Sequence, residues 1–156
     1  MTTPDAPPPT VWPALRARDA RGLIRFLVDA FGFEEVVTYG DQPDGSGDVV
    51  VHAELGWPLG GGVMLGSARD DGPWALTPGT AGCYVVTDDP DALHGRAVAA
   101  GAEVVQPLHD RAVAAGAEVL QPLHDTDYGS RDFAVRDPEG NRWSFGTYRG
   151  EPRPVS

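Results

Sequence analysis

The best candidates for acid–base or metal chemistry are His52 and Glu54, in the segment VVVHAEL. Residues two apart on a strand share one face of the sheet. The opposite face would then carry the apolar residues Val49, Val51, Ala53 and Leu55. An imidazole beside a carboxylate can act as an oriented base, and both groups can ligate a divalent metal ion. The spacing favours a polar or solvent-facing pair, with a binding-pocket or acid–base role and metal ligation as the alternatives.

Other residues that could carry chemistry have simpler interpretations. His109 and His124 each precede an aspartate, but adjacent residues on a strand point to opposite faces, so both are predicted as polar surface residues in a loop. His94 falls within a predicted helix and is expected to be exposed. Cys83 lies in an apolar strand and is predicted to fill the core, because a reactive thiolate needs a nearby cation or helix N-terminus. The glycines at 60–62 are not predicted to form a phosphate-binding loop, because the Lys-Ser/Thr pair of that motif does not follow them.

The elements that would position these residues begin with a strand at 11–17 and a helix. Asp19 is the expected N-cap of this helix and Gly32 its end. Its apolar face has helical spacing and consists of Leu23, Ile24, Leu27, Val28 and Phe31. Three further strands are predicted at 34–39, 49–55 and 63–67. The order of elements in this half is therefore β-α-β-β-β.

The same order restarts after a linker-like segment at 68–80, with a strand at 82–88 and a helix at 89–100. Equivalent residues lie 69 positions apart (88 − 19 = 69) and pair Asp19, Gly32 and Glu34 with Asp88, Gly101 and Glu103. Two alternating runs at 131–136 and 142–148 then flank Asp-Pro-Glu-Gly-Asn, whose residues suit a tight turn. We therefore expect two related modules, the second closed by a β-hairpin.

A second and younger repetition lies inside the second half. Residues 96–110 recur at 111–125 with one difference. Either the second EVLQP, at 118–122, forms the sheet strand and leaves 102–116 as an excursion, or the first copy forms the strand and the second is extruded. The spacing favours the first alternative. Two near-identical segments that compete for one position in a sheet permit register exchange or domain swapping.

Three stretches resemble the vicinal oxygen chelate superfamily, which holds glyoxalases, extradiol dioxygenases and bleomycin-resistance proteins. They read RDARGLIRFLVDAFGFEEV, GCYVVTDDPDALHGRAVAAGAEV and YGSRDFAVRDPEGNRWSFGTY. The resemblance covers roughly residues 11–148. It implies an α+β fold of two β-α-β-β-β modules, whose curled mixed sheets form a cup with the helices on the outer face.

The resulting domain organisation has five parts. These are a disordered Pro-rich tail at 1–10, a first module at 11–67, a linker at 68–80, a second module at 81–149 and a tail at 150–156. The second module contains the tandem duplication.

Metal-dependent members of this superfamily place one His or Glu ligand on each of four strands. The resemblance puts four other residues at these positions: Trp12, Met64 (within one residue), Gly82 and Ser144. None of them is a usable ligand for a divalent metal ion. We therefore expect no metal and no cofactor, unless displaced ligands such as His52 and Glu54 replace them.

Strand alternation predicts which side chains line the cup. Ser144 shares its side with Tyr148, while Trp143 faces the helix. The predicted ligand-binding residues are Trp12, Arg16, His52, Glu54, Met64, Tyr84, Ser144 and Tyr148. Such an aromatic-walled cup suits a flat or hydrophobic ligand. Trp57 and Trp74 lie in loops rich in Gly and Pro, where covering a core edge is favoured over lining a cavity mouth.

Charge and composition limit the possible partners and compartment. The formal net charge of -11 opposes binding to nucleic acid or to an anionic membrane surface. A single cysteine excludes an internal disulfide and fits a reducing compartment. The N-terminal residues do not form a secretory signal, and no apolar run is long enough to span a membrane. We expect a soluble cytoplasmic protein.

Together with the resemblance, these features predict metal-independent binding or sequestration of a small hydrophobic or aromatic molecule, as in antibiotic-resistance members. One alternative is a metal-dependent lyase or dioxygenase with displaced ligands, and another is a protein-interaction module that uses the inserted repeat. No catalytic residue is assigned. We expect a small-molecule partner and a homodimer, in which the cup forms within one chain or across a swapped pair.

Overall fold

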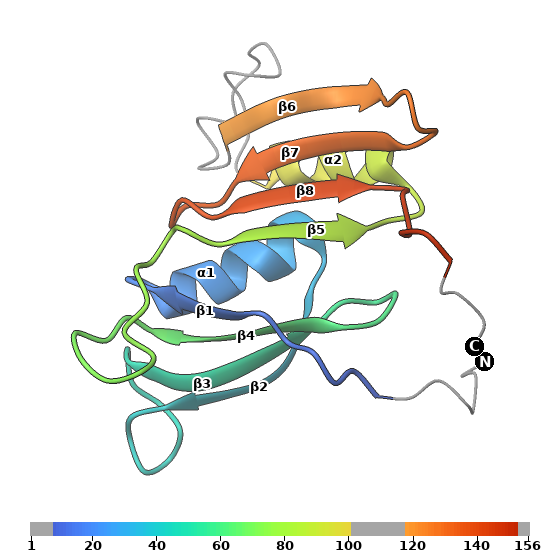
Figure 1. Cartoon of the computed structure of the whole chain (residues 1–156). Coiled ribbons are helices and arrows are strands. Elements are labelled where there is room, and N and C mark those ends of the chain that lie inside the picture. The colour runs from blue at the N-terminus through green and yellow to red at the C-terminus, as the bar shows by residue number, and fades with distance from the viewer. Residues whose placement is uncertain (1–7, 101–117, 153–156) are drawn as a thin grey trace. The chain divides into compact units, whose positions relative to one another are not determined.

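The computed structural model describes residues 8–100 and 118–152. It divides into two compact units, Met1–Gly79 and Thr80–Ser156. Each unit carries one four-stranded mixed sheet (Figure 1). The predicted α+β class and the two β-α-β-β-β modules are confirmed, while closure of the sheets into a cup stays a prediction. No helix within the described ranges is both long and apolar enough to cross a membrane.

The first module keeps the predicted order of elements. It consists of β1 (Ala14–Ala17), α1 (Ala20–Phe26), a π-helical turn η1 (Leu27–Phe31), β2 (Glu34–Gly40), β3 (Val50–Gly56) and β4 (Gly62–Ser67). The sheet has the order β1-β4-β3-β2, and β1 runs parallel to β4. Helix α1 contacts β1, β3 and β4. One face of the sheet is therefore covered by the helix.

The predicted boundaries of the first helix are confirmed. The Asp19 side chain accepts a hydrogen bond from the amide of Gly22 at 3.0 Å, and Gly32 ends the helix with φ at 90°, a conformation that favours glycine. The last five residues form π-helical rather than α-helical turns. Leu23, Leu27 and Phe31 are each buried against the sheet side of the module.

The second module repeats the topology. It consists of β5 (Gly82–Val86), α2 (Pro90–Ala99), β6 (Glu118–Asp125), β7 (Arg131–Arg136) and β8 (Arg142–Gly146). Its sheet has the order β5-β8-β7-β6, with β5 parallel to β8, and α2 contacts β6 and β7 (Figure 1). The N-cap of α2 is Asp89, which accepts from the amide of Ala92. The prediction that Asp88 matches Asp19 was therefore wrong by one residue.

The strand β6 comes from the second copy of the tandem duplication. Glu118–Asp125 contains EVLQP and pairs antiparallel with β7. This is the first of the two alternatives considered for the duplication. The proposed excursion at 102–116, as well as Gly101 and Glu103, lies outside the described residues.

The predicted apolar face of residues 49–55 was wrong at two positions. Val49 and Val51 are 49% and 47% exposed, whereas Val50 is buried. The β2–β3 register shifts here, because Gly40 pairs with Val50 and Tyr39 pairs with His52. Val51 is thus the extra residue of a β-bulge, which breaks the two-residue alternation on which the prediction depended.

The turn between β7 and β8 is organised by the buried carboxylate of Asp137. Its Oδ1 accepts hydrogen bonds from the amides of Glu139, Gly140 and Asn141 at 2.9–3.0 Å. Its Oδ2 accepts from Asn141 Nδ2 at 2.9 Å and from Trp143 Nε1 at 2.8 Å. Asn141 Oδ1 in turn accepts from the amide of Ala81, immediately before β5. One carboxylate therefore holds the hairpin and its neighbouring strand in place.

Replacing Asp137 by Ala is expected to lower the free energy of unfolding by about 3–5 kcal/mol, because five donors lose a charged acceptor in a buried position. Chemical denaturation of the variant measures this change. Asp127→Ala, in the exposed loop before β7, is the control and should change stability by no more than about 0.5 kcal/mol. Equal effects of the two substitutions would show that the network contributes nothing specific.

His94 was predicted to be exposed, but only 5% of it is accessible. Its ring packs edge-on against Phe133 with centroids 5.1 Å apart. Its Nε2 has no hydrogen-bond partner within the described part of the chain. Burial lowers the pKa of His94, opposed by the charge of Asp91 and assisted by that of Arg131. The imidazole is therefore neutral in the folded protein at neutral pH.

This burial predicts a loss of stability in weak acid. Below about pH 6.5 the unfolded chain binds a proton at His94 more readily than the folded chain does. The free energy of unfolding therefore decreases as the pH is lowered. Above that pH both states hold a neutral imidazole and the contribution is absent. Denaturation measured from about pH 7.5 to 5 should show a smaller decrease for His94→Leu than for the parent. Parallel curves would contradict this assignment.

Candidate functional site

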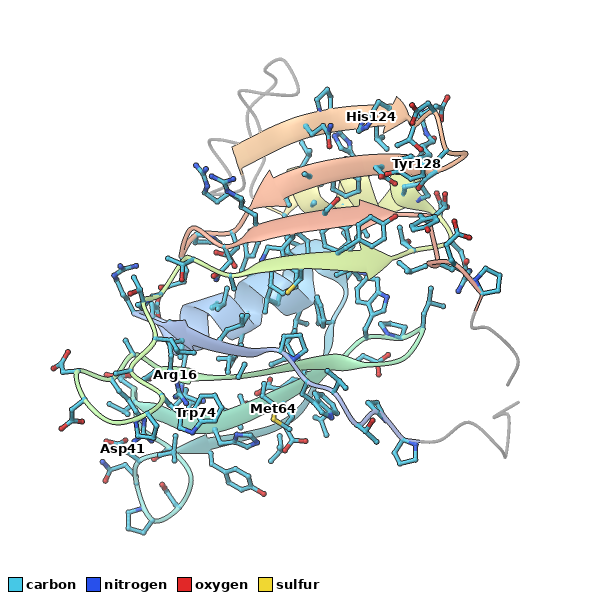
Figure 2. All side chains as sticks on the ribbon, viewed as in Figure 1. Arg16, Asp41, Met64, Trp74, His124 and Tyr128 are labelled. Carbon is cyan, nitrogen blue, oxygen red and sulfur yellow. The ribbon has the colours of Figure 1, made fainter. Side chains whose placement is uncertain are left out.

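The face of the first sheet opposite α1 carries a small cavity of about 210 Å³. Three predicted site residues, Arg16, His52 and Met64, line it together with Trp74. Figure 2 labels Arg16, Met64 and Trp74 on this module. Burial and the nearby charge of Arg69 lower the pKa of Arg16. Trp74, which was expected to cover a core edge, is an exposed cavity wall instead.

His52 and Glu54 contact each other directly, as their placement on one strand face allows. The distance from His52 Nε2 to Glu54 Oε2 is 2.8 Å, and the side chains are 39% and 31% exposed. A contact at this level of exposure contributes little to stability, about 0–1 kcal/mol even for fully charged groups. The arrangement supplies an oriented imidazole on a half-exposed surface.

Two other tryptophans take structural positions in this module. Trp12 precedes β1, so the predicted strand start at Val11 was too early and Trp12 does not belong to the strand. Its ring lies over Gly62, and its indole nitrogen donates to the carbonyl of Pro9. Trp57 packs against Phe33 with ring centroids 4.9 Å apart, as expected for a residue that covers a core edge.

The second sheet also leaves one face free of its helix. Trp143 and Phe145 of β8 are fully buried, while Ser144 between them is half-buried and lines a cavity of about 530 Å³. Tyr84 borders this cavity as well as a larger one of about 680 Å³, which Tyr148 also lines. The amide of Tyr148 donates to the hydroxyl of Tyr84 at 3.1 Å. The structure thus brings three predicted residues of this module close together.

The sequence analysis did not identify the carboxylate of Asp132, to which these tyrosines are connected by hydrogen bonds. Asp132 of β7 is only 4% exposed although it lies on the open face, opposite Gly146 of β8. It accepts hydrogen bonds from the hydroxyls of Tyr84 (3.3 Å), Tyr128 (2.9 Å) and Ser130. The alternation of β7 indicated its face, but not the hydroxyls that surround it.

Gly146 makes this arrangement possible. A Cβ at that position would collide with the Asp132 carboxylate and with the Tyr84 hydroxyl. Only a residue without a side chain therefore allows the carboxylate and the phenol to meet above β8. The role of Gly146 depends on this close approach, which the sequence pattern of β8 does not reveal.

The protonation of these groups suits hydrogen bonding rather than nucleophilic chemistry. The hydrogen bond to Asp132 raises the pKa of Tyr128. Burial, followed by the charge of Glu151, raises the pKa of Tyr148. Burial and the charge of Asp137 raise the pKa of Cys83, which is half-buried. The phenols and the thiol are consequently protonated at neutral pH.

His124 does not line any of the cavities described above. His124 lies in β6 rather than in a loop, which corrects the prediction, and its Nδ1 contacts the carbonyl of Pro122 at 2.7 Å. The loop prediction failed because β6 extends beyond EVLQP to Asp125. His109 lies outside the described residues.

The donor set does not fit the divalent metal ion of the metalloenzyme relatives. Trp12, Met64, Gly82 and Ser144, the residues that the resemblance assigns to the four ligand positions, offer no strong ligand. Within residues 8–100 and 118–152, no three His, Cys, Asp or Glu side chains gather so that they could hold a metal ion.

Comparison with known proteins identifies the family. The profile of the Glyoxalase/Bleomycin resistance protein/Dioxygenase superfamily matches residues 107–145. The structure also matches the bleomycin-binding protein of bleomycin-producing Streptomyces verticillus, solved with copper(II)-bleomycin, at 27% identity and a TM-score of 0.53. That match covers 90% of this chain and 96% of the other. The chain belongs to this superfamily.

Further solved structures share the superfamily fold. TioX from Micromonospora sp. ML1 is 26% identical with a TM-score of 0.62, over 88% of this chain and 98% of TioX. The bleomycin resistance determinant of transposon Tn5 has a TM-score of 0.57 at 15% identity, over 90% and 98% of the two chains, and shows the fold alone. No curated protein sequence matches the chain significantly.

The donor chemistry predicts that this superfamily member retains no stoichiometric metal. Protein incubated with Mn, Fe, Ni or Zn ions and then desalted should contain far less than one metal per chain by elemental analysis. The His52→Ala/Glu54→Ala double variant is the control and should give the same result. About one metal per chain in the parent, absent from the double variant, would contradict this prediction and assign His52 and Glu54 as displaced ligands.

Proposed function

We propose that this superfamily member binds and sequesters a small hydrophobic or aromatic molecule without using a metal ion. The observation that carries the proposal is the cavity of about 680 Å³ on the open face of the second sheet. Small-molecule sites in proteins have volumes of about 300–1,000 Å³, apolar walls and a few fixed polar groups. Tyr84, Tyr148 and Val86 supply such walls.

The polar groups of this cavity are held in place before any ligand binds. The Tyr84 hydroxyl donates to Asp132 and accepts from the amide of Tyr148. A wall that is already ordered loses little conformational freedom on binding, which favours affinity. The arrangement suits recognition of a molecule, because its hydroxyl, carboxylate and amide groups are already joined to one another by hydrogen bonds.

The likeness to the bleomycin-binding protein supports an antibiotic-resistance role. That relative is similar over nearly its whole length and is solved with copper(II)-bleomycin. A cationic or planar antibiotic is therefore the first ligand to test. The expected homodimer and the cytoplasmic location remain predictions alongside this proposal.

The alternative enzyme and interaction functions have weaker support. A lyase or dioxygenase with displaced ligands would depend on His52 and Glu54, which contact each other. An interaction module would depend on the repeat at 111–125, of which the structure describes the strand β6. The cavity that His52 lines has a volume of about 210 Å³, much smaller than the cavity that carries the proposal.

Isothermal titration calorimetry of chelator-treated protein with metal-free bleomycin, copper(II)-bleomycin and other planar antibiotics tests the proposal. At least one compound should bind, and Tyr148→Ala should weaken it about tenfold, equivalent to 1.4 kcal/mol of lost wall contact. Tyr39→Ala, which removes an exposed tyrosine of the first module, is the matched control and should bind like the parent. If no compound binds, or if binding requires added metal, the proposed function is wrong.

A further inference from the structure

The large cavity of the second module is bordered by three tyrosines that form a cage. Tyr84, Tyr128 and Tyr148 all line it. The rings of Tyr128 and Tyr148 meet edge to face, with centroids 5.4 Å apart and planes at 74°. Two rings at a steep angle and a third beside them offer several aromatic surfaces to one bound group.

Two of these rings are positioned by a common carboxylate. Tyr84 donates to Asp132 Oδ1 and Tyr128 donates to Asp132 Oδ2. Tyr148 is joined to Tyr84 through its backbone amide. The rings of Tyr84 and Tyr128 are therefore held by hydrogen bonds to one carboxylate, although Tyr128 is 58% exposed, and Tyr148 is fixed at its backbone.

The charge around the tyrosine cage is negative. Asp132 lies beneath it, and Glu151 also lines the cavity. The cation among the lining residues, Arg149, is paired with Asp88. The chain as a whole carries a formal net charge of -11, which raises the local concentration of cations.

Aromatic faces beside a carboxylate are the chemistry that recognises ammonium groups. The face of a phenol ring is negative and attracts a cation placed over it, and cages of such rings bind quaternary ammonium ligands. A neutral apolar ligand would gain nothing from a carboxylate whose burial costs free energy.

The hydrogen bonds that Asp132 already accepts limit the kinds of cation that fit the site. Both of its oxygens already accept from hydroxyl groups. A cation that needs no hydrogen bond of its own therefore fits better than a primary ammonium. A methylated ammonium is attracted by the charge and presents only methyl groups to the rings and to Val86.

We propose that the tyrosine cage binds a methylated ammonium group, so that the natural ligand is an organic cation. This inference rests on the proposed function of small-molecule binding and adds the chemical class of the ligand. It assigns Tyr84, Tyr128 and Tyr148 as the walls of the site and Asp132 as its fixed countercharge.

The test compares choline with its uncharged isostere 3,3-dimethylbutan-1-ol, in which carbon replaces the quaternary nitrogen. Each is titrated at millimolar concentration into the full-length protein, and the shifts of its methyl proton signals are followed by NMR. Choline should bind at least about fivefold more tightly, because only the charged compound gains the cation–π attraction. Its methyl signals should move upfield as they enter the cage.

Substitutions locate the binding. Tyr128→Leu should weaken choline at least about threefold while leaving the isostere nearly unchanged. Tyr39→Leu removes a tyrosine of similar exposure, 55% against 58%, from the other module and is the matched control. Asp132→Asn keeps the shape of the side chain but removes its charge, and should remove the preference for choline. Glu151→Gln tests the second charge at an exposed position if Asp132→Asn does not fold.

The outcomes separate this inference from the proposed function. If choline and the isostere bind equally, or if neither binds while a planar antibiotic still binds in calorimetry, the ammonium assignment is wrong and small-molecule binding stands. If Tyr39→Leu weakens choline as much as Tyr128→Leu does, the cage is not its site and the assignment is equally wrong. If no antibiotic and neither probe binds, both proposals fail.

Discussion

The hairpin of the second module depends on the carboxylate of Asp137, which accepts five hydrogen bonds at a buried turn. A buried charge is tolerated only when such donors replace water. The Trp143 indole is one donor, so the turn and the core are stabilised together. Asn141 extends the network to the start of β5. With β5, β7 and β8 in register, the side chains of the candidate site face one side.

Each sheet of this protein has two faces with different roles. One face is apolar and packs against a helix, as Phe133 and Phe145 do when they stack at 5.2 Å. The other face carries polar and aromatic side chains around cavities. Asp132 is a second buried carboxylate, but hydroxyl groups surround it instead of turn amides. The carboxylate of Asp137 therefore stabilises a turn, whereas that of Asp132 orders the hydroxyl groups on the open face of the sheet.

Local patterns predicted most elements because the interactions behind them are local. Asp19 and Gly32 cap and end a helix through contacts within a few residues, and the turn residues at 137–141 form hydrogen bonds among themselves. The predictions failed where a distant contact decides. His94 is buried because β7 supplies Phe133. Val51 is exposed because β2 pairs with β3 through a bulge, which alternation along β3 does not reveal.

The sequence by itself determined the two modules, the order of their elements and the closing hairpin. It also favoured the second repeat copy as the source of β6. Only the tertiary structure decided that Tyr84 meets Asp132, a residue 48 positions away, and that Tyr128 joins them. The reason is physical: periodicity assigns a side chain to a face, but pairing between strands decides which side chains on that face come within hydrogen-bonding distance.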